Sequence, residues 1–301
     1  KIFDKKVDEL RNRKLFFGPP IKKNILETQS RIMKSILGGN KNFNLLSGAS
    51  ACSQVIKIQH ALELLETQTL FSLREYIQDL FEQARQKKSK AVQNVIKQPE
   101  FNSAYIKLEE LIARKQEHPK LAEIKRILLA SFKENSKTKI IIFSQYRSTV
   151  TKICKGINSL PDVRARVFIG QAKKKTKSGE DMGLSQTEQA EIINDFKIGN
   201  INVLCATSIG EEGLDIPEVN TVIFYEPVPS AIRKIQRAGR TARLMKGNLI
   251  ILMTLDTRDE AYYYASIGKE KKMYNAIKGI KEDLDKNPTK NISQDPQKQL
   301  F

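Results

Sequence analysis

Short apolar runs rich in β-branched residues alternate with helical stretches through the second half of the chain. The runs occupy residues 139–143, 165–169, 201–206, 221–225 and 248–253. Apolar runs of this length are typical of strands buried on both faces of a sheet. Strands that alternate with helices form a parallel sheet whose crossovers place helices on both faces. The pattern therefore predicts an α/β domain over residues 133–270.

The first half of the chain has a helical period instead. Apolar residues recur there at spacings of three and four, as in the series Leu73, Ile77, Leu80, which predicts an all-α domain over residues 25–132. The segment Ser72 to Glu75 has the form of a capping box, and we expect it to open one of these helices. Residues 1–24 contain two consecutive prolines, Pro19 and Pro20, and are expected to be a linker or the end of a preceding domain. Residues 271–301 are polar and basic, which predicts a flexible tail.

The charge of the chain favours a polyanionic partner. The formal net charge is +18 and the pI about 9.7, so nucleic acid is the first candidate. No apolar run approaches the roughly 20 residues of a membrane-spanning helix. The three cysteines are far apart and odd in number, which fits neither a disulfide framework nor a metal site and favours a reducing compartment. We expect all three to be buried apolar residues, and His60 and His118 to have structural roles.

Polar loops follow the first three predicted strands. Carboxyl ends of parallel strands meet at one edge of a sheet, and sites of α/β domains lie there. Glycines let the backbone approach a ligand closely, and hydroxyl, amide and cationic groups bind phosphates. We therefore predict that a phosphate backbone is bound by Ser144, Gln145 and Arg147 after the first strand, Gly170 and Gln171 after the second, and Thr207 and Ser208 after the third.

A cluster of arginines follows the fourth predicted strand. Residues 236–243 contain three arginines, and a turn at Gly239 would direct Arg240 and Arg243 outward together. A guanidinium group suits phosphate because it donates two parallel hydrogen bonds and stays protonated. From these residues alone, a basic surface helix is the alternative.

These segments together resemble a known family. Residues 143–147, 170–171, 206–217 and 236–243 look like motifs IV, IVa, V and VI of superfamily 2 helicases, in that family's order. Four further stretches, residues 27–29, 60–68, 222–230 and 257–263, resemble archaeal Hef helicases, which are relatives of the Fanconi-anaemia M-type fork helicases. The resemblance implies a second RecA-like domain, with the parallel sheet of P-loop NTPases, preceded by a helical, thumb-like DNA-binding insert.

The resemblance also implies roles for individual residues. Arg240 and Arg243 would reach the γ-phosphate of ATP, which is held with Mg²⁺ mainly by a first RecA-like domain. Gln236 would position phosphate or the attacking water. The nucleotide side would be lined by Gly213, Asp215 and Gly239, and the seven loop residues given above would bind the DNA backbone. Ala242 departs from the family motif, where glycine is usual, and a methyl group is tolerable there if the backbone is helical.

The sequence has neither the phosphate-binding loop G-x-x-x-x-G-K-[ST] nor an acidic magnesium box ahead of the arginine cluster. Arg258 to Tyr262 imitates such a box but is better explained as the start of a helix with acidic residues in its first turn. We therefore predict the C-terminal part of an ATP-dependent DNA helicase, acting inside the cell on forked or branched DNA in replication-fork repair and inactive towards ATP alone. Its expected partners are that DNA, the first RecA-like domain and a C-terminal nuclease domain. An ATP-independent nucleic-acid-binding module and half of an RNA helicase remain as alternatives.

Overall fold

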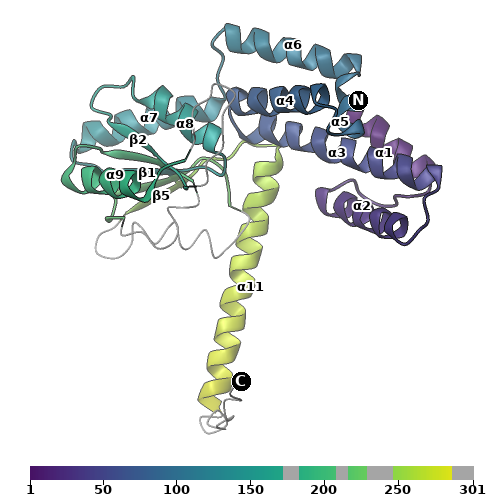
Figure 1. The fold of residues 1–301 in the computed structure, drawn as a ribbon. Helices are drawn as coiled ribbons and strands as arrows, with labels where there is room; N and C mark the ends of the chain where they lie inside the picture. Colours follow the sequence, from purple (N-terminus) through teal and green to yellow (C-terminus); the bar gives the residue numbers. More distant parts are fainter. Residues whose placement is uncertain (172–182, 208–215, 229–246, 287–301) are drawn as a thin grey trace, which may run out of the picture.

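The computed structural model of the chain describes residues 1–171, 183–207, 216–228 and 247–286. Two parts lie next to each other, a bundle of helices from the first half of the chain and a sheet covered by helices from the second half (Figure 1). A long C-terminal helix leaves from between them. The two-part α then α/β architecture predicted from the sequence is confirmed.

The bundle is organised around one central helix of 25 residues, α3. It consists of α1 (Ile2–Asn12), α2 (Lys22–Leu37), α3 (Phe43–Thr67), α4 (Leu70–Arg85), α5 (Lys90–Ile96) and α6 (Pro99–Ala113). One apolar cluster, with Leu10, Ile25 and Val55 completely buried, joins α1, α2 and α3. A second cluster around Leu80 and Val92 joins α3 to α4, α5 and α6. The bundle therefore has its own core.

The structure corrects two expectations about this half. Residues 1–24 are not a linker throughout, because α1 lies within them and buries Val7 and Leu10 against α3. The alternative, that they form the end of a preceding domain, stays a prediction. Ser72 does not open a helix either. The cap of α4 is Thr69, whose side chain accepts a hydrogen bond from the Ser72 N–H at 3.2 Å. The serine sits in the first turn, where its hydroxyl is free to bond elsewhere.

The second half contains a five-stranded parallel sheet in the order β2-β3-β1-β4-β5. The strands are β1 (Ile140–Phe143), β2 (Ala165–Phe168), β3 (Val203–Ala206), β4 (Thr221–Phe224) and β5 (Asn248–Ile251). They pair in register, so that Phe143 lies opposite both Ala206 and Phe224. All five predicted strands are present, each one or two residues shorter than its apolar run.

Helices cover both faces of this sheet, as the apolar runs predict. Ile140 and Ile142 pack into one cluster with α7 (Pro119–Glu134) and α8 (Arg147–Ile157). Ile141 and Phe143 pack into the other cluster, with α9 (Gln186–Ile198). We expected α7 in the helical half, but its apolar face belongs to the sheet. The boundary between the two parts therefore falls between α6 and α7.

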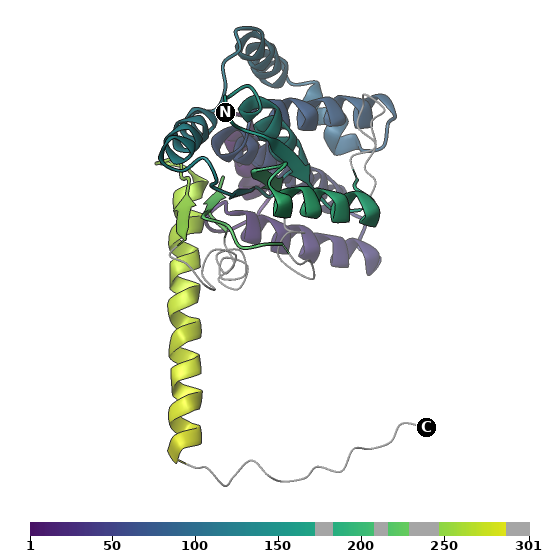
Figure 2. The same ribbon diagram turned by 90° about the vertical axis from the view of Figure 1, so that its left-hand side faces the viewer.

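The last described element is α11 (Arg258–Lys286), a helix of 29 residues that projects away from both parts (Figures 1 and 2). Its first turn contains Asp259 and Glu260, which confirms the interpretation of residues 258–262 as a helix start. The expectation of a flexible tail from residue 271 is wrong up to Lys286, because the helix continues to that residue.

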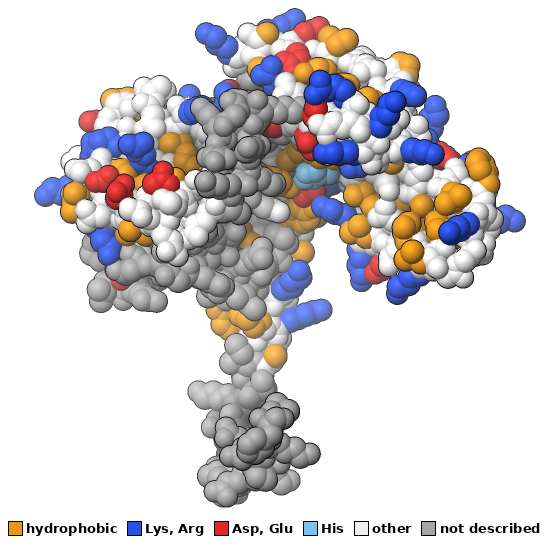
Figure 3. All heavy atoms as spheres, viewed as in Figure 1, with side chains coloured by type: hydrophobic (Ala, Val, Ile, Leu, Met, Phe, Trp, Pro, Cys, Tyr) orange, Lys and Arg blue, Asp and Glu red, His pale blue; other side chains and the backbone are white. Residues whose placement is uncertain are grey.

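The remaining sequence expectations concern single residues and the surface. Cys52, Cys154 and Cys205 are free and buried, as expected. Lysine and arginine side chains are spread over the visible surface of both parts rather than gathered on one of them (Figure 3). Among the described residues, no helix is both long and apolar enough to cross a membrane.

Candidate nucleic-acid interface

The loops after β1, β2 and β3 meet at one edge of the sheet. The Ser144 N–H donates to the Ala206 carbonyl at 3.0 Å, and the Thr207 N–H donates to the Phe168 carbonyl at 3.2 Å. These bonds continue the strand ladders by one residue beyond the strands. The predicted convergence of these loops is therefore present in the fold, for the residues that the structure describes.

Arg147 connects two of these loops. Its Nη2 donates to the Gly170 carbonyl oxygen at 3.3 Å, which ties the start of α8 to the end of β2. Gln145 and Gln171 are exposed on either side of this contact, and Arg147 itself is half-buried. Gly170 and Thr207 are buried and can offer a ligand mainly backbone groups. The edge thus presents two amides and a guanidinium group.

Ser144 is placed differently from our expectation. Its side chain is fully buried, and its hydroxyl donates to Glu226 Oε2 at 3.1 Å. The Gln145 N–H donates to the other carboxylate oxygen, Oε1. The hydroxyl of Ser144 therefore supports the loop from inside and is not available to a DNA backbone.

Sequence reasoning missed Glu226. This residue comes two positions after β4, at the same edge of the sheet, and is buried. An acidic residue directly after a buried strand was the available signal, since such a position faces the other loops. In the fold its carboxylate holds the first loop by two charge-assisted hydrogen bonds.

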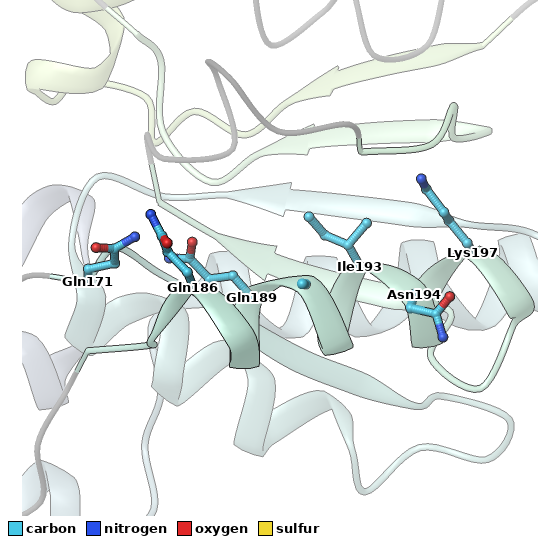
Figure 4. A pocket seen from close by; sticks show the side chains of 7 residues that line it. Gln171, Gln186, Gln189, Ile193, Asn194 and Lys197 are labelled. Carbon is cyan, nitrogen blue, oxygen red and sulfur yellow. The ribbon is translucent and has the colours of Figure 1, made fainter.

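A groove runs from this edge along α9. It has a volume of about 420 Å³ and is lined by Gln171, Gln186, Gln189, Ala190, Ile193, Asn194 and Lys197 (Figure 4). Gln189 is fixed at the floor, because its Nε2 donates to the Ile169 carbonyl at 3.0 Å. Amide groups and an ammonium group are donors suited to phosphate oxygens. The spacing of three and four along one face of α9 could have identified these residues.

The predicted nucleotide-side residues lie outside the described part of the chain. These are Gly213, Asp215, Gln236, Gly239, Arg240 and Arg243, together with Ser208 of the backbone-binding set. Among the residues that the structure describes, no group of acidic, histidine and cysteine side chains could hold a metal ion. The roles of the nucleotide-side residues therefore stay predictions.

Charged groups also connect the bundle to the base of α11. Glu63 on α3 accepts from Tyr262 Oη at 3.1 Å and pairs with Lys22 at 3.2 Å. Burial by itself raises the pKa of Glu63, but hydrogen bonds with His60, Lys22 and Tyr262 outweigh it and lower the pKa to about 2. Beside it, Arg258 pairs with Glu66 at 3.0 Å. The direction of α11 is thus set by contacts with the bundle.

Two family models match the chain. Residues 119–245 match a helicase conserved C-terminal domain, and residues 7–116 match the helical bundle of a putative ATP-dependent RNA helicase. The start of the first match at residue 119 coincides with the start of α7. This agrees with the assignment of α7 to the sheet domain.

Known helicases resemble the chain over half to most of its length. A putative ATP-dependent RNA helicase of Methanocaldococcus jannaschii is 42% identical over 231 residues, which cover 76% of this chain and 28% of that protein. An ATP-dependent DNA helicase of Neurospora crassa is 40% identical over 148 residues, covering 48% of this chain and 12% of that one. The crystal structure of the Pyrococcus furiosus Hef helicase domain superposes with a TM-score of 0.68 at 38% identity, covering 88% of this chain and 54% of that chain. The chain therefore spans only part of the length of each.

Proposed function

Because the chain belongs to the Hef-like helicases of superfamily 2, we propose that it is the C-terminal part of an ATP-dependent DNA helicase or translocase that acts on forked or branched DNA. The observation that carries this proposal is the carboxyl edge of the sheet. There Gln145, Arg147 and Gln171 come together beside a groove of amide groups. Such an edge binds a nucleic-acid strand through its phosphates, independently of the base sequence.

In this proposal the chain contributes half of an ATPase site. Arg240 and Arg243 stabilise the negative charge that develops on the γ-phosphate, and Gln236 positions the phosphate or the water. ATP and Mg²⁺ are held mainly by a first RecA-like domain, and a nuclease domain is a further partner. An arginine that crosses an interface in this way accelerates phosphoryl transfer by on the order of a thousandfold or more.

The binding part of the proposal can be tested with the chain itself. Labelled forked DNA and linear duplex are titrated with the chain at several salt concentrations. We expect preference for the fork and a steep salt dependence. Arg147→Ala should weaken binding and reduce the salt slope by about one phosphate contact.

Arg164→Ala is the matched control for this experiment. Arg164 precedes β2, at the opposite end of the strand from Gly170, and its guanidinium donates to the Gly199 and Asn200 carbonyls. Its removal should leave binding within about twofold of the parent chain. Equal losses in the two variants would mean that general positive charge, not this edge, binds DNA.

The catalytic part is tested by steady-state ATP hydrolysis. The chain alone should show no turnover with forked DNA. In a longer protein that contains the phosphate-binding loop, turnover should be present and should vanish in Arg240→Ala. Turnover by the purified chain alone that Arg240→Ala abolishes would overturn the assignment of half a site.

A role on RNA is the second candidate, and the names of one matching family model and one relative favour it. Forked substrates of identical sequence in DNA and RNA separate the two. Tighter binding of RNA would indicate contacts with 2′-hydroxyl groups. We expect the DNA fork to bind more tightly, as the resemblance to DNA fork helicases implies.

A further inference from the structure

A buried network of hydroxyl groups joins the helical bundle to the corner between β1 and α8. The bundle contributes Gln68, Thr69 and Ser72, and the sheet domain contributes Ser144, Ser148 and Thr149. Gln68 lies at the C-terminal cap of α3 and is 1% exposed. None of these contacts involves the phosphate-facing surface directly. All of them lie behind the loop that carries Gln145 and Arg147.

The direction of these hydrogen bonds follows from proton counting. A hydroxyl group has one proton to donate. Thr149 donates its proton to Gln68 Oε1 at 2.8 Å. The 2.9 Å contact between Ser72 and Thr149 must then be donated by Ser72. Thr69 in turn donates to the Ser72 oxygen at 2.9 Å. Ser148 lies 2.9 Å from the same oxygen and shares its single proton between Ser72 and the Glu75 carboxylate. The whole series therefore ends at Gln68 Oε1.

The amide of Gln68 is oriented by its second contact. Its Nε2 donates to Thr67 Oγ1 at 3.2 Å, and the Thr67 hydroxyl donates to the Glu63 carbonyl at 2.8 Å. Because the Thr67 proton is used in that bond, its oxygen must accept, and the opposite amide orientation would place two acceptors together. Gln68 is thus an acceptor that α3 holds against the start of α8.

The network also reaches the loop after β1. Ser144 Oγ lies 3.4 Å from Gln68 Oε1 and 3.1 Å from Glu226 Oε2. Both acceptors share its single proton, and the shorter bond to the carboxylate is the stronger one. The loop is therefore held between a residue of the bundle and a residue that follows β4.

We propose that Gln68 is a positioning residue through which the helical bundle fixes the orientation of Arg147 and Gln145 at the nucleic-acid edge. The inference rests on the proposed function of that edge. A buried acceptor that loses its donor is costly in a low-dielectric interior, so the bundle and the β1–α8 corner keep one arrangement. The side chains at this edge are then ordered before nucleic acid binds, so binding does not include the entropic cost of ordering them.

A matched pair of substitutions at Thr149 tests this. Thr149→Val keeps the shape of the side chain but removes the proton that Gln68 accepts, whereas Thr149→Ser keeps that proton. We expect Thr149→Val to weaken binding of forked DNA about three- to tenfold, the equivalent of one net hydrogen bond. Thr149→Ser should restore affinity to within about twofold of the parent chain. Thermal unfolding of both variants shows that they are folded.

A combined variant separates positioning from a general loss of stability. If Thr149→Val acts through Arg147 and Gln145, then adding Thr149→Val to a chain that already carries Arg147→Ala and Gln145→Ala should weaken binding of forked DNA no further. A further loss in that combined variant would overturn the inference, because sites that act independently are additive.

Hydrogen exchange supplies a readout that does not need nucleic acid. The Ser144 and Gln145 amides are bonded to the Ala206 carbonyl and to Glu226. We expect their exchange to accelerate in Thr149→Val and not in Thr149→Ser. If the chain binds no DNA but exchange is faster in Thr149→Val, the lack of binding would contradict the proposed function. The faster exchange would still support the positioning role of Gln68. Unchanged exchange would overturn the positioning role even if DNA binds.

Discussion

Lys120 on α7 and Asp259 on α11 form an ion pair inside the molecule, although 139 residues separate them in the chain. Lys120 Nζ also donates to the Thr67 carbonyl at 3.2 Å, and Asp259 Oδ2 accepts from the Thr254 N–H at 3.1 Å. The end of α3, the start of α7 and the start of α11 therefore meet at one buried charged contact. Burial lowers the pKa of Lys120, and the attraction of Asp259 opposes that effect.

Breaking this pair should be strongly destabilising. Lys120→Met leaves the Asp259 carboxylate buried without its cation, and we expect a loss of about 3–5 kcal/mol in the free energy of unfolding. The exposed pair between Arg126 and Glu123 is the control, and Arg126→Ala should change the free energy of unfolding very little, because solvent screens an exposed ion pair. Chemical denaturation measures both. Equal effects of the two substitutions would show that the buried pair does not hold the junction.

Glu63 should make the stability of the protein depend on acid pH. Its pKa falls from an ordinary 4.5 to about 2 in the fold, so its contribution is complete above pH 4.5 and is lost as the pH decreases towards 2. In Glu63→Gln this part of the pH dependence should be absent. We expect a difference on the order of 1–2 kcal/mol between the two proteins at neutral pH, after allowance for solvent screening. The free energy of unfolding of both proteins is measured between pH 2 and 6. A difference between the two proteins that stays constant over this pH range would contradict the prediction.

His118 should contribute a second, separate pH dependence. It caps α7 and its Nε2 lies 3.1 Å from the Glu66 carbonyl, while burial lowers its pKa below 6.5. The unfolded chain therefore binds a proton more readily than the fold between these pKa values, so stability decreases as the pH falls below 6.5. His118→Asn keeps a capping side chain without a titrating group. The loss of stability just below pH 6.5 should disappear in this variant, and its persistence would assign that loss to another residue.

Two helical glycines should respond oppositely to alanine. A Cβ on Gly48 in α3 would lie 2.2 Å from Leu15 Cδ1, whereas a Cβ on Gly268 in α11 would have no atom within 4 Å. Gly268→Ala should be neutral or stabilising by up to about 1 kcal/mol, because alanine favours a helix. Gly48→Ala should be less stable than Gly268→Ala by about 1–3 kcal/mol, because the half-buried Leu15, which packs against the core of α1, α2 and α3, must shift to make room. Denaturation midpoints compare the two, and stabilisation by Gly48→Ala would show that the core accommodates a methyl group there.

Part of the candidate site could be predicted from local sequence. The strands can be recognised as short apolar runs, which is a property of neighbouring residues in the sequence. Because parallel strands end at the same edge of a sheet, the sequence also predicts that the loops after Phe143, Phe168 and Ala206 meet. The exposed positions of Gln145 and Gln171 agree with a surface role. The groove along α9 was not predicted, although its residues recur at spacings of three and four on one face of that helix.

Ser144 shows where this reasoning stops. Its type and place suited a phosphate contact, yet its hydroxyl is bound by Glu226 and lies near Gln68, which are 82 and 76 residues away. Whether a loop side chain faces solvent or the interior depends on what packs behind the loop. The local pattern of apolar residues does not reveal which distant residues pack there.

The sequence by itself determined the two-part architecture, the parallel sheet and the edge that carries the polar loops, because apolar period and strand ends are local properties. Only the tertiary structure decided that α7 covers the sheet, that α1 belongs to the bundle and that the bundle is joined to the sheet through Gln68, Lys120 and Asp259. These features depend on contacts between residues distant in the chain. Burial restricts which contacts can form, because a buried polar group must have a hydrogen-bond partner, and that partner can come from a distant part of the chain.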